Sequence, residues 1–172
     1  MKGSRIRGPK IVKKKAIDTE KDPYLPEESP GDVGECKKCG IIYTGKHWAL
    51  KSNAPEDVLL KEPKVKLVCP ACRKIMENFA EGYVTIHGDF LKGHKDEILN
   101  LIRNKEKIAM DSNPLERIIE IKDRAGTIEV TTTTEKLAQR IGQMLHKAFH
   151  GEVEYKWSDD VKLARVVWSR QG

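Results

Sequence analysis

Four cysteines arranged as two Cys-x-x-Cys pairs are the residues of this chain whose types and spacing best suit a chemical site. The pairs are Cys36 with Cys39 and Cys69 with Cys72, and the 172-residue sequence contains only these 4 cysteines. Four thiolates complete the tetrahedral coordination of zinc, and each Cys-x-x-Cys turn directs two sulfurs towards one centre. Such a site leaves no open position for a substrate, so its role is to stabilise a fold. The spacing therefore predicts one structural Zn²⁺ ion in a zinc ribbon.

Two other uses of paired cysteines suit this sequence less well. Two disulfides would fit a small secreted protein, but the sequence shows no signal-peptide pattern and no apolar stretch that would span a membrane. A redox-active pair would need one Cys-x-x-Cys beside a βαβ unit, not two matched pairs. We therefore expect reduced, metal-binding thiols in a cytoplasmic protein without a membrane partner.

The positive charge of the chain is concentrated in two segments. The net charge is +6 at pH 7. Residues 1–15 contain seven bases and no acid, and residues 36–75 contain nine bases and three acids. Residues 16–35 contain seven acids and one base, whereas residues 76–172 are balanced, with fifteen bases and sixteen acids. Because Lys and Arg displace counterions from phosphates, we expect the two basic segments to attract a polyanion.

Fourteen of the sixteen bases in these two segments are the candidate nucleic-acid contacts. They are Arg5, Arg7, Lys10, Lys13, Lys14, Lys15, Lys37, Lys38, Lys46, Lys51, Lys64, Lys66, Arg73 and Lys74. Contacts of this kind position a structured RNA without reading its sequence, and binding through them weakens steeply with salt.

The sequence divides into three parts. Residues 1–33 are rich in Gly, Pro, Ser and charge, which predicts a disordered basic arm followed by an acidic hinge. Residues 34–80 hold the cysteines and form the predicted zinc ribbon, with a protruding loop between the two pairs. Residues 81–170 show regular hydrophobic periodicity and form the predicted α+β domain.

Alternation of apolar and polar residues predicts five strands in the third part, and helical periodicity predicts two helices. The strands are expected at 83–87, 117–121, 127–131, 153–157 and 161–168, and the helices at 94–109 and from a Thr132–Glu135 capping box to Phe149. The order β-α-β-β-α-β is that of the ferredoxin-like, split βαβ fold, here with an extra C-terminal strand. We expect both helices on one face of an antiparallel sheet and the other face open.

Two other functions compete with RNA binding. The ribbon and the open sheet face would suit a protein–protein adaptor in a larger complex. His87, Asp89 and His94 lie close in sequence and would form the acid–base cluster of a metal-dependent hydrolase or nuclease, although polar residues are common in a strand-to-helix loop. The sequence has no glycine-rich phosphate-binding motif. We therefore expect a non-catalytic protein.

Several motifs resemble one known family. They are Cys-x-x-Cys-Gly at 36–40, Cys-Pro-x-Cys at 69–72, Tyr-Val-Thr-Ile-His-Gly at 83–88, Asp-Arg-Ala-Gly-Thr-Ile-Glu-Val at 123–130 and Ala-Arg-Val-Val-Trp-Ser-Arg at 164–170. They are similar to the large-ribosomal-subunit export adaptor (nonsense-mediated mRNA decay protein three) and its archaeal relatives. The resemblance implies association with ribosomal RNA or the large subunit. That family usually carries more than one Cys-x-x-Cys ribbon site and a long C-terminal region with export signals. This sequence shows one ribbon site and no such region, so the resemblance does not imply nuclear export.

Overall fold

The computed structural model describes residues 33–44, 47–61, 65–158 and 160–172. The predicted arm and hinge therefore lie outside the described residues, apart from Val33. The candidate RNA contacts that lie outside them are Arg5, Arg7, Lys10, Lys13, Lys14, Lys15, Lys46 and Lys64.

The part that holds the cysteines folds around a small sheet with the strand order β3-β2-β1-β4. The strands are β1 (Gly34–Cys36), β2 (Ile42–Tyr43), β3 (Trp48–Ala49) and β4 (Val65–Leu67). Strand β1 runs antiparallel to β2 and parallel to β4. Two short helices, η2 (Lys51–Asn53) and α1 (Glu56–Leu59), occupy part of the segment where the sequence predicted only strands and a loop.

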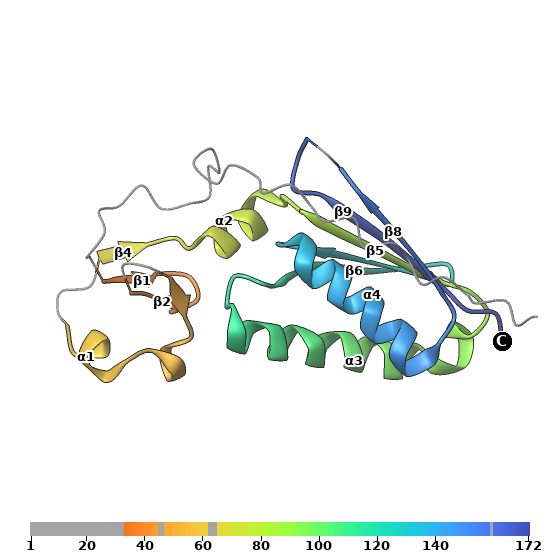
Figure 1. Cartoon of the computed structure of the whole chain (residues 1–172), viewed down its shortest axis with the longest axis horizontal. Coiled ribbons are helices and arrows are strands. Elements are labelled where there is room, and N and C mark those ends of the chain that lie inside the picture. The colour runs from red at the N-terminus through yellow and green to blue at the C-terminus, as the bar shows by residue number, and fades with distance from the viewer. Residues whose placement is uncertain (1–32, 45–46, 62–64, 159) are drawn as a thin grey trace, which may run out of the picture.

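The second part contains a five-stranded sheet with the order β6-β7-β5-β9-β8. Its elements are β5 (Gly82–His87), α3 (Leu91–Ser112), β6 (Ile118–Arg124), β7 (Thr127–Thr132), α4 (Glu135–Phe149), β8 (Glu152–Trp157) and β9 (Ala164–Ser169). Helices α3 and α4 cover one face of this sheet, and α2 (Pro70–Glu77) leads from the small sheet into β5 (Figure 1). The predicted α+β class and the β-α-β-β-α-β order with a further C-terminal strand are confirmed.

The predicted antiparallel sheet is wrong in one strand pair. Strand β9 runs parallel to β5 and lies between β5 and β8, so the sheet is mixed. The extra strand thus fills an interior position, and β8 forms the edge. This order follows from composition, because β9 buries Ala164, Val166 and Trp168 under the helices, whereas β8 carries charged residues that an edge strand tolerates.

The core lies between the helices and the sheet. Alternate residues of β5, β7 and β9 point towards the helices, and they meet the apolar faces of α3 and α4. The fully buried members are Val84, Ile86, Ile98, Ile102, Ile128, Val130, Leu137, Ile141, Leu145, Val166 and Trp168. Among the described residues, no helix is both long and apolar enough to cross a bilayer.

Several predicted boundaries shift, and three of the shifts have a clear position or cause. Helix α3 begins at Leu91, three residues earlier than expected, and β9 begins at Ala164 instead of residue 161. The N-cap of α4 is Thr134, whose hydroxyl accepts a hydrogen bond from the backbone N–H of Leu137. The predicted Thr132 cap is wrong because Thr132 ends β7 and its hydroxyl donates to the Thr134 carbonyl instead.

Close packing of α4 on the sheet gives a testable result. A Cβ at Gly142 would lie 2.6 Å from Cγ1 of Val166, so Gly142→Ala overpacks the core. Overpacking costs about 1–3 kcal/mol and outweighs the gain of up to about 1 kcal/mol in helix propensity. We expect a net loss in the free energy of unfolding, measured by urea titration. Gly93→Ala in α3, where no atom lies within 4 Å, is the matched control and should stabilise; a stabilising Gly142→Ala would contradict this packing.

Candidate metal centre

The four cysteine side chains converge on one point, as the sequence predicted. Their sulfurs lie within 4.8 Å of one another, and among the described residues they are the one group of three or more Cys, His, Asp or Glu placed to hold a metal ion. The sulfurs of Cys39 and Cys69 are 3.7 Å apart. Metal–sulfur bonds of about 2.3 Å in a tetrahedron place neighbouring sulfurs about 3.8 Å apart. The donor set therefore fits a tetrahedral metal ion.

The first pair sits in the turn between β1 and β2. The backbone N–H of Gly40 donates to the carbonyl of Cys36 at 2.8 Å, and the N–H of Cys36 donates to the carbonyl of Ile41 at 2.9 Å. Gly40 has a φ of 78°, which an L-residue with a side chain rarely adopts. The glycine after the pair therefore permits the tight turn that aims both sulfurs inward.

The second pair belongs to the start of a helix. Cys69 is the N-cap of α2, and its sulfur accepts from the backbone N–H of Cys72 at 3.3 Å. Pro70 occupies the first turn, where a missing N–H costs nothing. The sequence predicted a second turn of the ribbon type here, so this local structure is a correction. A helix N-terminus also favours the negative charge of thiolates.

Arg117 is a buried residue of the centre that the sequence did not reveal. It follows α3, and its guanidinium donates to the sulfur of Cys39 at 3.0 Å and to the sulfur of Cys72 at 3.5 Å. Its Nε donates to the carbonyl of Pro114 at 2.9 Å. Donors of this kind orient metal ligands and offset their negative charge. The only local sign of Arg117 in the sequence is its place shortly after Asn113-Pro114, a helix-breaking pair. The strand pattern predicts Arg117 as the first residue of the strand 117–121.

The thiols and Arg117 influence one another's protonation. The pKa of Cys39 is lowered to about 4, chiefly by the hydrogen bond from Cys69 and also by the Ile41 N–H and Arg117. The same hydrogen bond and burial raise the pKa of Cys69, and burial raises that of Cys72 to about 11. Burial opposes the charge of Arg117, but the hydrogen bond to Cys39 and the thiolate charges outweigh it and raise the Arg117 pKa. A bound metal would replace the remaining thiol protons, since metals bind thiolates.

Buried polar residues join the centre to the five-stranded sheet. Lys74 of α2 donates to the Glu81 carboxylate at 2.8 Å and to the carbonyl of Thr133 at 3.1 Å. Thr133 in turn exchanges hydrogen bonds with the backbone of Arg117. Lys74 was predicted to contact RNA, but its side chain is buried and paired, so that prediction is wrong. The basic residue instead fixes α2 against the neighbouring domain.

The remaining described RNA candidates reach solvent. Lys37, Lys38, Lys51 and Arg73 are exposed. Lys66 is also exposed, and its ammonium pairs with the Glu35 carboxylate at 3.0 Å.

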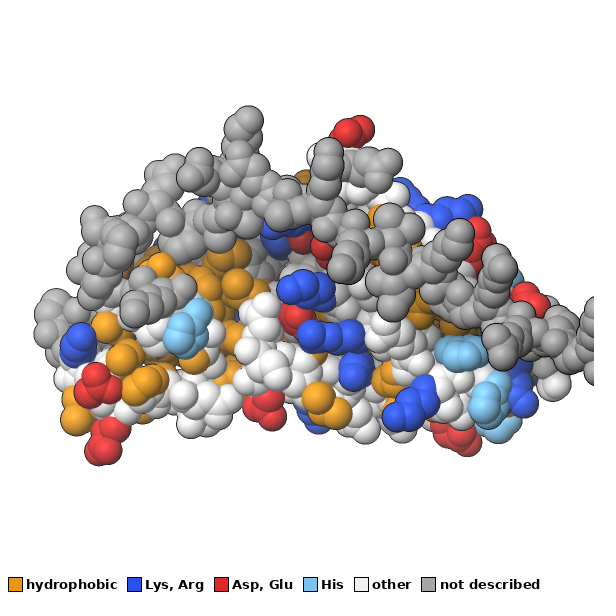
Figure 2. Space-filling view, in the orientation of Figure 1, with side chains coloured by type: hydrophobic (Ala, Val, Ile, Leu, Met, Phe, Trp, Pro, Cys, Tyr) orange, Lys and Arg blue, Asp and Glu red, His pale blue; other side chains and the backbone are white. Residues whose placement is uncertain are grey.

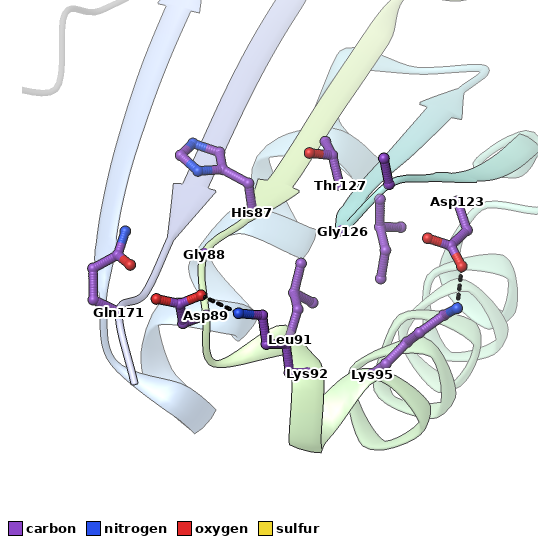
Figure 3. A pocket seen from close by; sticks show the side chains of 12 residues that line it. His87, Gly88, Asp89, Leu91, Lys92, Lys95, Asp123, Gly126, Thr127 and Gln171 are labelled. Carbon is purple, nitrogen blue, oxygen red and sulfur yellow. Dashed lines mark hydrogen bonds and ion pairs between the residues drawn. The ribbon is translucent and has the colours of Figure 1, made fainter.

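The alternative hydrolase cluster is not assembled. His87 and Asp89 line a hollow of about 600 Å³ together with Lys92, Lys95 and Asp123, but the His87 ring points away from Asp89 (Figure 3). Asp89 pairs with Lys92, which lowers the Asp89 pKa, and Asp123 pairs with Lys95.

His94, the third residue of that alternative, lies apart from the hollow. Its ring stacks on Phe90 with 3.9 Å between ring centroids, and its Nδ1 lies 3.3 Å from Oε2 of Glu97. The structure therefore does not bring together the three residues of the hydrolase alternative.

Comparison with known proteins adds no relative: no family model matches the chain, and no curated protein matches it.

Proposed function

We propose that this protein is a non-catalytic RNA-binding factor that docks on structured RNA through the bases of its metal-bound ribbon. The observation that carries the proposal is the position of Lys37 and Lys38. Both lie inside the first Cys-x-x-Cys turn, between two metal ligands, and both are exposed. A turn fixed at both ends by sulfur–metal bonds holds two ammonium groups close together at little entropic cost, which suits contact with phosphates.

The ion in this proposal is Zn²⁺, because four thiolates without an open position are typical of structural zinc. Its role is to hold the ribbon in shape. Reduced thiols of this kind persist in a reducing compartment, so the proposal places the protein in the cytoplasm. The resemblance of the ribbon and strand motifs to the large-subunit export adaptor makes ribosomal RNA the first RNA to test.

The test is co-sedimentation with ribosomal subunits in sucrose gradients at low and high salt. We expect binding that falls steeply with salt, and a Lys37→Gln, Lys38→Gln variant whose log–log salt slope is shallower by about 2. The matched control is Lys92→Gln with Lys95→Gln, which removes the same charge at the far end of α3. Binding that is insensitive to salt, or equal in the two variants, would contradict docking through the ribbon.

A protein–protein adaptor is the second candidate, and exposed apolar residues beyond the metal centre favour it. Met76 of α2 is 63% exposed, and Phe79, which follows α2, is 47% exposed. Large apolar side chains that remain in water together often mark a protein interface. Co-purifying proteins that survive nuclease treatment, and that are lost in Met76→Ser with Phe79→Ser, would support this candidate over RNA.

A further inference from the structure

The second part of the chain has balanced charge, but its charges are not evenly distributed over its surface. Helix α4 carries Lys136, Arg140 and Lys147 and has no acid after Glu135. Spacings of four and seven residues place these three bases on one stripe of the helix. The stripe runs about 16 Å along the helix axis, because each residue adds about 1.5 Å.

A base from the neighbouring helix joins this stripe. The side chain of Arg140 pairs with Glu116, a carboxylate that is 2% exposed. Lys136 of α4 and Lys105 of α3 lie close enough to act electrostatically on the same carboxylate. One base thus pairs directly with the buried acid, and two more, one from each helix, act on it electrostatically. We call Lys105, Lys136, Arg140 and Lys147 the basic helix face, and in Figure 2 Lys and Arg side chains gather over α4.

The opposite face of the sheet shows a different pattern. Its outward residues include bases that pair with acids on the same strand, Lys122 with Glu120 and Lys156 with Glu154. Arg165 lies over the ring of Tyr83 at 4.8 Å from its centroid. The sheet face therefore offers three bases for a matched control. Its two lysines are each paired with an acid on the same strand, and its arginine lies over an aromatic ring.

Two buried residues link the basic helix face to the metal centre. Glu116, which pairs with Arg140, is followed directly by Arg117, whose guanidinium bonds the sulfur of Cys39 at 3.0 Å. Lys38 precedes Cys39 in the first turn of the ribbon. Lys38 is therefore linked to Glu116 through Cys39, the hydrogen bond from Arg117 to the Cys39 sulfur, and Arg117 itself.

We propose that the basic helix face is a second phosphate-contacting surface, along which an RNA backbone that docks on the ribbon continues over α4. This inference rests on the proposed function and extends it to the second part of the chain, whose balanced net charge gives no sign of an RNA-binding surface. An array about 16 Å long is able to follow a few consecutive phosphates. A uniform polyanion fits such a stripe better than a protein partner does, because protein interfaces are depleted in lysine at their core.

The test compares charge-matched variants of the full, zinc-loaded chain for binding a fluorescein-labelled RNA hairpin by fluorescence anisotropy over a range of salt concentrations. The helix-face variant is Lys105→Gln, Lys136→Gln, Lys147→Gln; Arg140 is kept because its removal would leave Glu116 buried and unpaired. The sheet-face control is Lys122→Gln, Lys156→Gln, Arg165→Gln. The third variant is Lys37→Gln, Lys38→Gln in the ribbon. Thermal unfolding confirms that each variant folds.

We expect the helix-face variant to bind roughly tenfold more weakly at physiological ionic strength, with a log–log salt slope shallower by about 2 to 3. The sheet-face control should change affinity less than about threefold, because only non-specific attraction is lost. Equal losses in the two triple variants, or no loss in the helix-face variant, would overturn the inference.

The outcomes separate this inference from the proposed function. If the ribbon variant loses affinity and the helix-face variant does not, RNA docks on the ribbon alone and the inference fails. If the helix-face variant alone loses affinity, the helix face contacts phosphates by itself, and both docking through the ribbon and the continuation of the RNA from the ribbon are overturned. Absence of RNA binding by the unaltered chain overturns both. Binding of poly-glutamate in its place, weakened by the helix-face changes, would assign the surface to an acidic protein partner.

Discussion

Removal of one sulfur from each pair, in a Cys39→Ser, Cys69→Ser variant, is expected to abolish metal binding and to unfold the ribbon. The ribbon has little else to hold it, because its strands are two or three residues long and the cysteines themselves make up half of its main buried cluster. Structural zinc contributes about 10–16 kcal/mol in isolated zinc-finger peptides at neutral pH. The five-stranded sheet has a core of its own and should stay folded.

Metal analysis and hydrogen exchange measure this outcome together. The unaltered chain should contain one zinc ion per molecule, and amide hydrogens of β1 and β2 should be protected. The double variant should contain none and should exchange rapidly in both strands, while β5 and β7 stay protected. Ala71→Ser, which alters a buried neighbour and leaves four thiols, is the control and should keep its zinc. Retention of one zinc ion by the double variant would rule out a four-thiolate site.

The features that the sequence predicted correctly are local. Two Cys-x-x-Cys pairs specify their own turns, and the alternation in residues 82–87 and 127–132 marks strands whatever lies beside them. The helix that begins after Cys69 was missed, although Pro70 at its first position is a known signal of a helix start.

The features that it missed depend on contacts between distant segments. The strand patterns of β8 and β9 permit either strand to lie beside β5. In the structure β9 takes that place and β8 forms the edge. Lys74 was predicted to be a surface base and Arg117 a strand residue, since nothing in their neighbours along the chain shows that Glu81 and the thiols will satisfy them. The basic helix face consists of residues of α3 and α4. The net charge of residues 76–172 hides it, because acids elsewhere in that part of the chain balance its bases.

The junction between the ribbon and the sheet explains why those buried charges are kept. Arg117 and Lys74 each reach from one part of the molecule to the other, and both are paired: Arg117 donates to the sulfurs of Cys39 and Cys72, and Lys74 donates to the Thr133 carbonyl. Buried charges with complete partners are tolerated, whereas a lost partner leaves an unsatisfied group. These bonds therefore hold the ribbon in one orientation against the five-stranded sheet.

Arg117→Met is the substitution expected to break that arrangement. The sulfurs of Cys39 and Cys72 and the carbonyl of Pro114 would lose their donors. Cys72 and Pro114 are buried, and an unsatisfied buried acceptor costs about 1–3 kcal/mol. Loss of a donor next to metal ligands typically weakens metal binding by about 10–100-fold, so zinc should leave more readily in a chelator competition. Arg117→Lys should recover little, because an ammonium lacks the planar fork that reaches three acceptors.

The metal-binding measurement distinguishes a role at the thiolates from simple packing. Arg165→Met, which removes an exposed arginine, is the control and should leave zinc affinity and the free energy of unfolding nearly unchanged. Loss of a charged donor to two metal ligands should weaken zinc binding. If Arg117→Met lowered the free energy of unfolding but changed zinc affinity by less than about twofold, the guanidinium would therefore only fill space at the junction. If zinc affinity falls in Arg117→Met and hydrogen exchange rises in both α2 and β6, the metal centre and the sheet behave as one unit, and metal loss will also free the ribbon from the basic helix face.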